Sequence, residues 1–234
     1  MDTIEDLRGA ADRIIALHED GEFEAALELA DEVVTVAAAA HERRRDDPIA
    51  RESLFVARFE RALLLAQSGR YVEAAGAFAE AADTPIDPED PDQRHEVAMA
   101  LLHQGMCHDQ AGQIDEAIGA YETVIEGFAL AGDAVTRDQV VRARANRAAA
   151  LLMRGDLEAA TAAAHELRQD LDPAAPLDAE QWVLAARIEA AALSRAGDVE
   201  QARDRLQATR QVTADAPEVV EQRELAEAEL AELD

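Results

Sequence analysis

The sequence predicts an all-α protein, a right-handed α-solenoid of about five helix-turn-helix repeats followed by a C-terminal capping helix. The first reason is composition: of 234 residues, 49% are hydrophobic, only 3% are aromatic and 54 are alanine, which favours helices over strands. The second is a glycine-centred phrase that recurs five times along the chain. The third is the spacing of apolar residues on both sides of each glycine, which is three and four and therefore helical.

Each copy of the phrase is predicted to be one helical hairpin that turns at its glycine. A glycine lets the backbone leave the end of a helix in the left-handed conformation. Successive glycines are separated by 48, 43, 43 and 42 residues, taken as differences of their residue numbers. The glycines are Gly21, Gly69, Gly112, Gly155 and Gly197.

Two further positions recur with the glycine. A large apolar residue stands two positions after it, and an alanine stands five positions after it in every copy. A methyl side chain lets two antiparallel helices pack closely, and a larger one is expected to push them apart. The large residues are Phe23, Tyr71, Ile114, Leu157 and Val199, and the alanines are Ala26, Ala74, Ala117, Ala160 and Ala202.

We expect one domain over residues 1–234, with repeats at 3–45, 49–84, 92–131, 136–170 and 178–214 and a capping helix at 217–234. Proline-rich stretches at 83–92 and 171–178 separate the hairpins. Helices are predicted to start at Thr136 and Asp178, because a glutamine follows each by three residues, as in a capping box. Pro217 is predicted to begin the capping helix.

The charge of the chain argues against some classes of partner. Fifty acidic residues against 22 basic ones give a net charge of −28, and every fixed positive charge is an arginine because the chain has no lysine. Such a field repels the phosphates of nucleic acids. The favoured partners are basic or amphipathic protein segments.

The chain is expected to be cytoplasmic. It has no apolar run near the roughly 20 residues that a membrane span needs, and its first residues lack the basic start and apolar core of a secretory signal. With Cys107 as the one cysteine, no internal disulfide is expected.

The repeat resembles the tetratricopeptide repeat, in a longer bacterial variant with a period near 43 residues. The third copy matches best, since Gly105, Gly112, Ala117 and Tyr121 stand where that family has glycine, glycine, alanine and an aromatic residue. The resemblance implies that the first helix of each hairpin lines a concave groove that binds a protein or peptide segment. Other copies depart from the pattern, for example by Ala164 in place of the second aromatic.

Counting back from the glycines of the second to fourth copies gives the side chains expected on that inner face. They form an apolar strip that contains methionine and suits an extended or helical peptide. The alternative is a groove filled by the chain's own C-terminal helix or by a second subunit. The predicted groove residues are Val56, Phe59, Leu63, Met99, Leu102, His103, Met106, Arg142, Asn146 and Met153.

Polar residues on the first helices have two interpretations each. Arg142 and Asn146 are four residues apart and together suit a carboxylate, against the alternative of a solvated arginine. A column eight residues before each glycine is expected to form ion pairs between neighbouring helices rather than to bind a ligand. The column consists of Arg13, Arg61, Gln104, Arg147 and Glu189.

We expect no catalysis, no cofactor and no metal. His103 and Cys107 are one helical turn apart, but the further ligands that a zinc site needs are missing. The acidic stretch 83–92 lacks the glycine that a calcium loop needs, and no nucleophile, base or phosphate-loop motif appears. The sequence therefore predicts a non-catalytic scaffold for protein or peptide partners. The alternatives are a self-associating structural protein and a regulatory sensor for a small peptide or metabolite.

Overall fold

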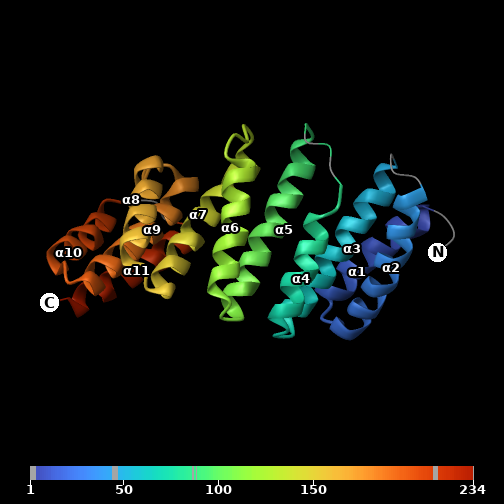
Figure 1. The fold of residues 1–234 in the computed structure, drawn as a ribbon, viewed down its shortest axis with the longest axis horizontal. Coiled ribbons are helices and arrows are strands. Elements are labelled where there is room, and N and C mark those ends of the chain that lie inside the picture. Colours follow the sequence, from blue (N-terminus) through green and yellow to red (C-terminus); the bar gives the residue numbers. More distant parts are fainter. Residues whose placement is uncertain (1–3, 44–46, 86, 88, 213–215, 234) are drawn as a thin grey trace. The chain divides into compact units, whose positions relative to one another are not determined.

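The computed structural model describes residues 4–43, 47–85, 87, 89–212 and 216–233 (Figure 1). Over these residues the chain has eleven α-helices, one short 3-10 turn at Thr209–Gln211 and no strand. This confirms the predicted all-α class. The helices are α1 (Ile4–Glu19), α2 (Phe23–Arg43), α3 (Pro48–Gln67), α4 (Tyr71–Ala82), α5 (Pro91–Gln110), α6 (Ile114–Phe128), α7 (Ala134–Arg154), α8 (Leu157–Asp170), α9 (Pro176–Ala196), α10 (Val199–Ala208) and α11 (Pro217–Glu232).

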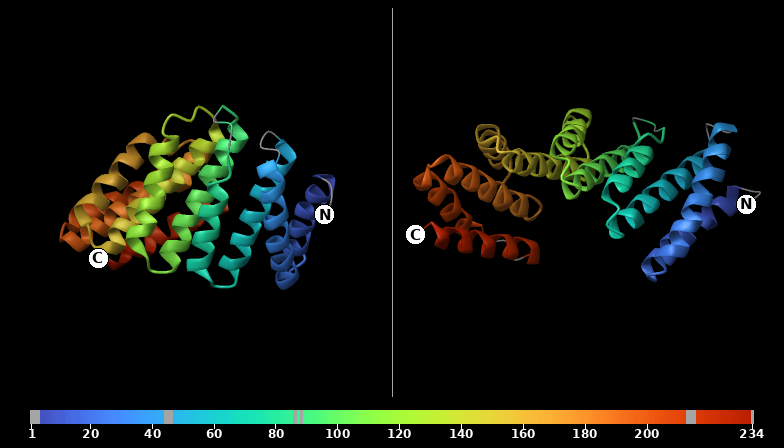
Figure 2. Two further views of the ribbon diagram at one scale, coloured as in Figure 1. Left: turned by 45° about the vertical axis from the view of Figure 1, so that its right-hand side comes forward. Right: turned by 60° about the horizontal axis from the view of Figure 1, so that its bottom comes forward.

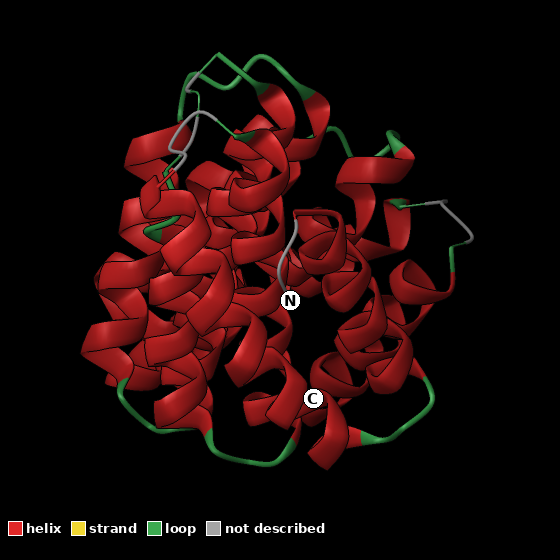
Figure 3. Cartoon of the chain, turned by 90° about the vertical axis from the view of Figure 1, so that its right-hand side faces the viewer, coloured by secondary structure: helices red, strands yellow, loops and turns green. Residues whose placement is uncertain are grey.

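The five predicted turns all occur at the predicted glycines. Each glycine lies between the two helices of a hairpin and has a φ between 73° and 91°. No other described residue has a positive φ, because side chains larger than hydrogen are strained there. Antiparallel neighbouring helices joined at these turns are visible along the chain in Figures 1 and 3.

The five alanines that follow the glycines are buried as predicted, each with no exposed surface. In α2 and α4, for example, Ala26 and Ala74 pack against the core side chains Leu17 and Phe78 of the same hairpins. A methyl group at this point leaves room for the first helix of the hairpin.

The chain folds into two compact units. Unit 1 comprises residues 1–120 and 130–136, and unit 2 comprises residues 121–129 and 137–234. The division falls inside α6, so the units do not coincide with the repeats that the sequence marks.

The core of unit 1 is built from α1 to α5. One cluster contains Phe55, Phe59 and Phe78, and a second contains Ile14 and Val33 with other aliphatic side chains. Aromatic contacts within the first cluster connect α3 to α4, with ring centroids of Phe59 and Phe78 5.3 Å apart. These contacts hold the first helices α3 and α5 beside α4 in one packed layer.

The core of unit 2 places the only tryptophan, Trp182, beside Val183 of α9 and Val219 of α11. Further along α11, Leu230 packs with the α10 residue Leu206. The last helix therefore covers the apolar side of α9 and α10, beside which it runs in Figure 2. It begins at Pro217 as predicted.

The two capping-box predictions are wrong. At the start of α7 the cap is Asp133, whose Oδ1 accepts a hydrogen bond of 2.7 Å from the backbone N–H of Thr136. The helix α9 starts at Pro176, and Asp178 instead binds Arg137 and the backbone N–H of Asp172. At α7, the aspartate Asp133 is a stronger N-cap than the predicted threonine. At α9, Pro176 occupies the first turn, where its missing N–H leaves no helical hydrogen bond unmade.

Candidate functional site

The predicted groove residues of unit 1 mostly lie on one stripe of α3 and α5. Val56 and Leu63 of α3 are half-buried, as are Met99, His103 and Met106 of α5. In each helix these side chains are three, four or seven residues apart and so share a face. We call these five residues the inner stripe.

Two other predicted groove residues belong to the core instead. Leu102 has no exposed surface, so the prediction that it lines a groove is wrong. Phe59 is 9% exposed, and its ring stacks on Phe55 at 5.6 Å and meets the edges of Phe78 and His103. Both residues stand ten positions before their glycine, about 40° to 60° around the helix from stripe residues three and four positions away. They therefore lie at the edge of the same face, on the side that packs into the hairpin.

The remaining predicted groove residues belong to unit 2. Arg142 and Asn146 are half-buried on α7, and Met153 is 63% exposed near its end. Arg142 makes no ion pair within the described part of unit 2. The carboxylate-binding interpretation of these residues stays a prediction.

A cleft of about 360 Å³ opens beside the inner stripe, between α1, the start of α2 and the end of α3. Its apolar walls are aliphatic, apart from one phenyl ring that is 46% exposed. The lining residues are Ile15, His18, Glu19, Phe23, Glu60, Leu63 and Gln67.

Hydrogen bonds fix the polar groups of this cleft. His18 Nδ1 lies 2.7 Å from Glu60 Oε2, and His18 Nε2 lies 2.7 Å from Gln67 Nε2. A carboxylate only accepts, so Nδ1 carries the proton toward Glu60 and Nε2 accepts from the Gln67 amide. The imidazole is thereby held between α1 and α3, and it forms a T-shaped contact with the Phe23 ring at a centroid distance of 5.9 Å.

Leu63 is the predicted groove residue in this cleft, and the inner-face positions of the second copy also include Glu60. The lining residues of α1 were missed because the prediction covered the second to fourth copies and left out the first. Ile15 stands six residues before its glycine, as Leu63 does before its own, so the same count extended to α1 finds it.

The polar column forms ion pairs between neighbouring helices, as the structural interpretation predicts, at three of its five positions. Arg61 Nε is 2.5 Å from Asp31 Oδ1 of α2, and Arg147 Nε is 2.9 Å from Glu122 Oε1 of α6. In the fifth copy the sign is reversed, and Glu189 of α9 receives cations from α8 and α10.

Glu189 is the most buried carboxylate among the described residues, at 2% exposure. It accepts hydrogen bonds from Arg205 Nε at 2.7 Å and Arg168 Nε at 3.0 Å, and His165 Nδ1 lies 3.0 Å from it. Burial acts to raise the pKa of Glu189, but these charged and polar donors outweigh it and lower the pKa below its usual value. The group is a buried ionic junction between three helices, with its acceptor positions already occupied.

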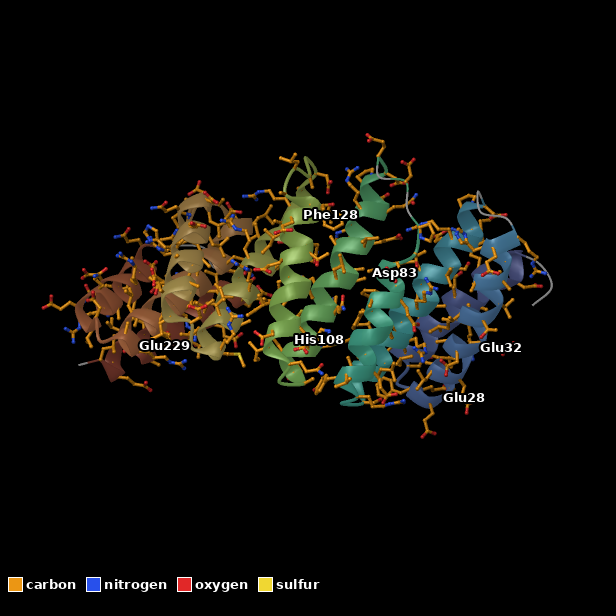
Figure 4. All side chains as sticks on the ribbon, in the orientation of Figure 1. Glu28, Glu32, Asp83, His108, Phe128 and Glu229 are labelled. Atoms are coloured by element: carbon orange, nitrogen blue, oxygen red, sulfur yellow. The ribbon has the colours of Figure 1, made fainter. Side chains whose placement is uncertain are left out.

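The residues considered for metal binding have other roles. Burial raises the pKa of the Cys107 thiol to about 11, so it stays protonated near neutral pH. His108 Nδ1 lies 2.9 Å from Gln113 Oε1 at the turn (Figure 4), and His103 stacks on Phe78. Within the described ranges no three histidine, cysteine or acidic side chains are grouped so that they could hold an ion.

The acidic stretch 83–92, considered for calcium, is described except at residues 86 and 88. Asp90 there caps α5 by accepting from the backbone N–H groups of Asp92 and Gln93. Among the described helices, none combines the length and the apolar character that crossing a membrane requires.

Comparison with known proteins identifies the architecture. No family model and no curated protein matches the chain. Among solved structures, it is similar to the nearly identical tetratricopeptide-like repeats of a putative kinesin light chain from Podosopora anserina, with 18% identity, a TM-score of 0.65 and coverage of 91% of this chain and 97% of that one.

A second similar structure is BtubC from P. vanneervenii, with 17% identity, a TM-score of 0.61 and coverage of 90% of both chains. A substituted form of the Podosopora anserina protein gives 19% identity, a TM-score of 0.62 and coverage of 91% and 96%. At these identities the likeness concerns the fold, and it agrees with the five glycine turns and the buried alanines. The chain has the tetratricopeptide-repeat fold, an all-α helical-repeat architecture.

Proposed function

We propose that the protein is a non-catalytic interaction module and that the inner stripe of unit 1 binds a peptide or protein segment. The observation that carries the proposal is the half-buried apolar character of Val56, Leu63, Met99 and Met106 on the adjacent helices α3 and α5. Each leaves part of its apolar surface in water, and a partner side chain laid across the stripe removes that surface from water. Thioether side chains adapt to partner groups of different shape, which suits a peptide surface.

The architecture supports the same proposal. Tetratricopeptide-repeat folds generally mediate protein–protein interaction. Aromatic contacts of Phe59 with Phe78 and with the stripe residue His103 connect α3 to α4 and α5. A rigid surface loses little conformational entropy when a partner binds.

The test uses peptides selected against the whole chain from a display library. We expect the double substitution Met99→Asp and Met106→Asp to weaken their binding at least about tenfold, because two charges would be desolvated under the peptide. Calorimetry measures the affinity, and circular dichroism checks that the helices remain. Val72→Asp is the matched control, since Val72 is 59% exposed on α4 and outside the stripe.

Equal affinity of the stripe variant and the wild type for every selected peptide contradicts the proposal. Sedimentation of the peptide-free chain separates it from self-association, the alternative in which another copy covers the stripe. A strict monomer at micromolar concentration leaves the stripe free for a foreign partner.

A further inference from the structure

We infer that the cleft between α1, α2 and α3 binds an arginine side chain of the partner, an inference that rests on the proposed function and specifies its partner as a basic segment. The cleft of about 360 Å³ adjoins the inner stripe through Leu63, which belongs to both. A segment lying on the stripe can therefore place one side chain in the cleft.

The hydrogen-bonding groups left over in the cleft are mostly acceptors. Both nitrogens of His18 are already bonded, to Glu60 and Gln67. What remains is Glu60 Oε1, Gln67 Oε1 and the Glu19 carboxylate, none of which bonds to a described residue. The one donor left is the second amide hydrogen of Gln67. A ligand that carries several donors and no acceptor is complementary to this set.

The charge of the cleft has the same implication. Glu19 and Glu60 line it, and its lining contains no arginine. The Glu60 side chain is only 14% exposed, so its charge is less screened by water than a surface carboxylate. A cation therefore gains attraction here that a neutral or anionic side chain does not.

The apolar walls distinguish an arginine side chain from a bare cation. Ile15 and Leu63 offer aliphatic contact for a methylene stem. The half-exposed ring of Phe23 offers a face on which a planar guanidinium stacks. Arginine has five N–H donors in one plane, which fits acceptors on both α1 and α3.

The experiment titrates the whole ¹⁵N-labelled chain with N-acetyl-arginine methylamide and, separately, with the uncharged isostere N-acetyl-citrulline methylamide. We expect the arginine compound to shift the amide signals of residues 15–23 and 60–67 and to bind about fivefold more tightly than citrulline. Raising the salt from about 50 to about 500 mM should weaken only the arginine compound.

Substitutions localise the effect. Glu60→Gln keeps an acceptor for His18 but removes the charge, and Glu19→Gln removes the other carboxylate. We expect each to weaken the arginine compound about threefold to fivefold. Glu32→Gln is the control, because Glu32 is exposed on α2 and lies outside the cleft lining (Figure 4); it should leave the affinity unchanged.

Equal binding of the arginine and citrulline compounds, or shifts confined to other residues, would overturn the inference. The two proposals fail separately. If Met99→Asp and Met106→Asp abolish peptide binding while Glu19→Gln and Glu60→Gln do not, the stripe binds peptides without an arginine pocket. If the arginine compound binds the cleft but peptides ignore the stripe substitutions, the pocket stands without the proposed function.

Discussion

At the scale of single residues, the fifth copy of the repeat differs from the others by a reversal of charge. Arginines at the column position of the second and fourth copies bind acidic residues of the second helices, whereas Glu189 binds Arg168 and Arg205. The second, fourth and fifth copies thus keep a bridge between helices, and the fifth exchanges the sign of its members. A buried junction of this kind is costly to break, because removing one partner leaves the others charged and desolvated.

The substitution Glu189→Gln tests this junction. We expect it to lower the free energy of unfolding by about 3 kcal/mol near neutral pH, because Arg168 and Arg205 lose their counter-charge in the interior. Urea unfolding followed by Trp182 fluorescence measures the change, since Trp182 lies in the same unit and contacts Arg168. Glu73→Gln, which removes an exposed pair with Arg70, should cause no measurable change.

The difference in unfolding free energy between the wild type and Glu189→Gln should depend on pH in a definite direction. Because the folded state lowers the pKa of Glu189, its ionisation stabilises the fold above the unfolded value of about 4.3, and this contribution is lost as the pH falls through the folded pKa. The difference between wild type and Glu189→Gln should therefore shrink below about pH 4. A difference that stays constant from neutral to acid pH would refute the role of the charge.

At the scale of elements, each hairpin depends on a glycine whose conformation other residues rarely adopt. Gly69 has a φ of 73° between α3 and α4, whereas Gly76 lies inside α4 without a positive φ. A Cβ added at either position meets no atom within 4 Å, so the two sites differ in backbone conformation and not in space.

We expect Gly69→Ala to destabilise the protein by about 1 kcal/mol, through left-handed strain. Gly76→Ala should instead stabilise it by about 0.5 to 1 kcal/mol, because alanine is the better helix former. Thermal unfolding followed by circular dichroism compares them. Equal effects of the two substitutions would show that the turn does not require a left-handed residue.

The hairpins could be predicted because their determinants are local: a glycine with positive φ, an alanine five residues later and the helical spacing of apolar residues. The starts of α7 and α9 could not be predicted from the sequence. The capping-box spacing pointed to Thr136 and Asp178, whereas the upstream residue Asp133 caps α7 and α9 starts at Pro176. The burial of Leu102 was missed for a geometric reason. Leu102 is three residues from Met99 and four from Met106, so it shares their side of the helix. Its burial depends on how the neighbouring helices pack against the edge of that side, and the spacing along one helix does not contain this information.

At the scale of the whole molecule, the chain is strongly acidic and consists of two compact units. Unit 1 carries the candidate binding surface, and in unit 2 the last helix, α11, covers α9 and α10. Under the proposed function, the net charge of −28 favours the approach of a basic segment, and the carboxylates of the cleft add a short-range preference of the same sign. The cleft could not be predicted, because it requires side chains from α1, α2 and α3 that are up to 52 residues apart, from Ile15 to Gln67.

The stability of unit 2 should depend on its last helix. Leu230 is 6% exposed against α10, whereas Leu225 of the same helix is 41% exposed. We expect Leu230→Ala to lower the stability reported by Trp182 fluorescence by about 2 to 3 kcal/mol, and Leu225→Ala to change it by less than about 0.5 kcal/mol. A Trp182 transition insensitive to Leu230→Ala would mean that α11 contributes no stability to α9 and α10.

Cys107 is 5% exposed and burial raises the pKa of its thiol to about 11, so we expect it to react slowly with maleimide reagents near neutral pH. Cysteines introduced in place of both Leu130, which is 98% exposed in unit 1, and Leu177, which is 80% exposed in unit 2, would then be the two reactive thiols of the chain. With a donor and an acceptor fluorophore attached to them, single-molecule energy transfer would report whether the distance between the two sites changes when a partner peptide binds.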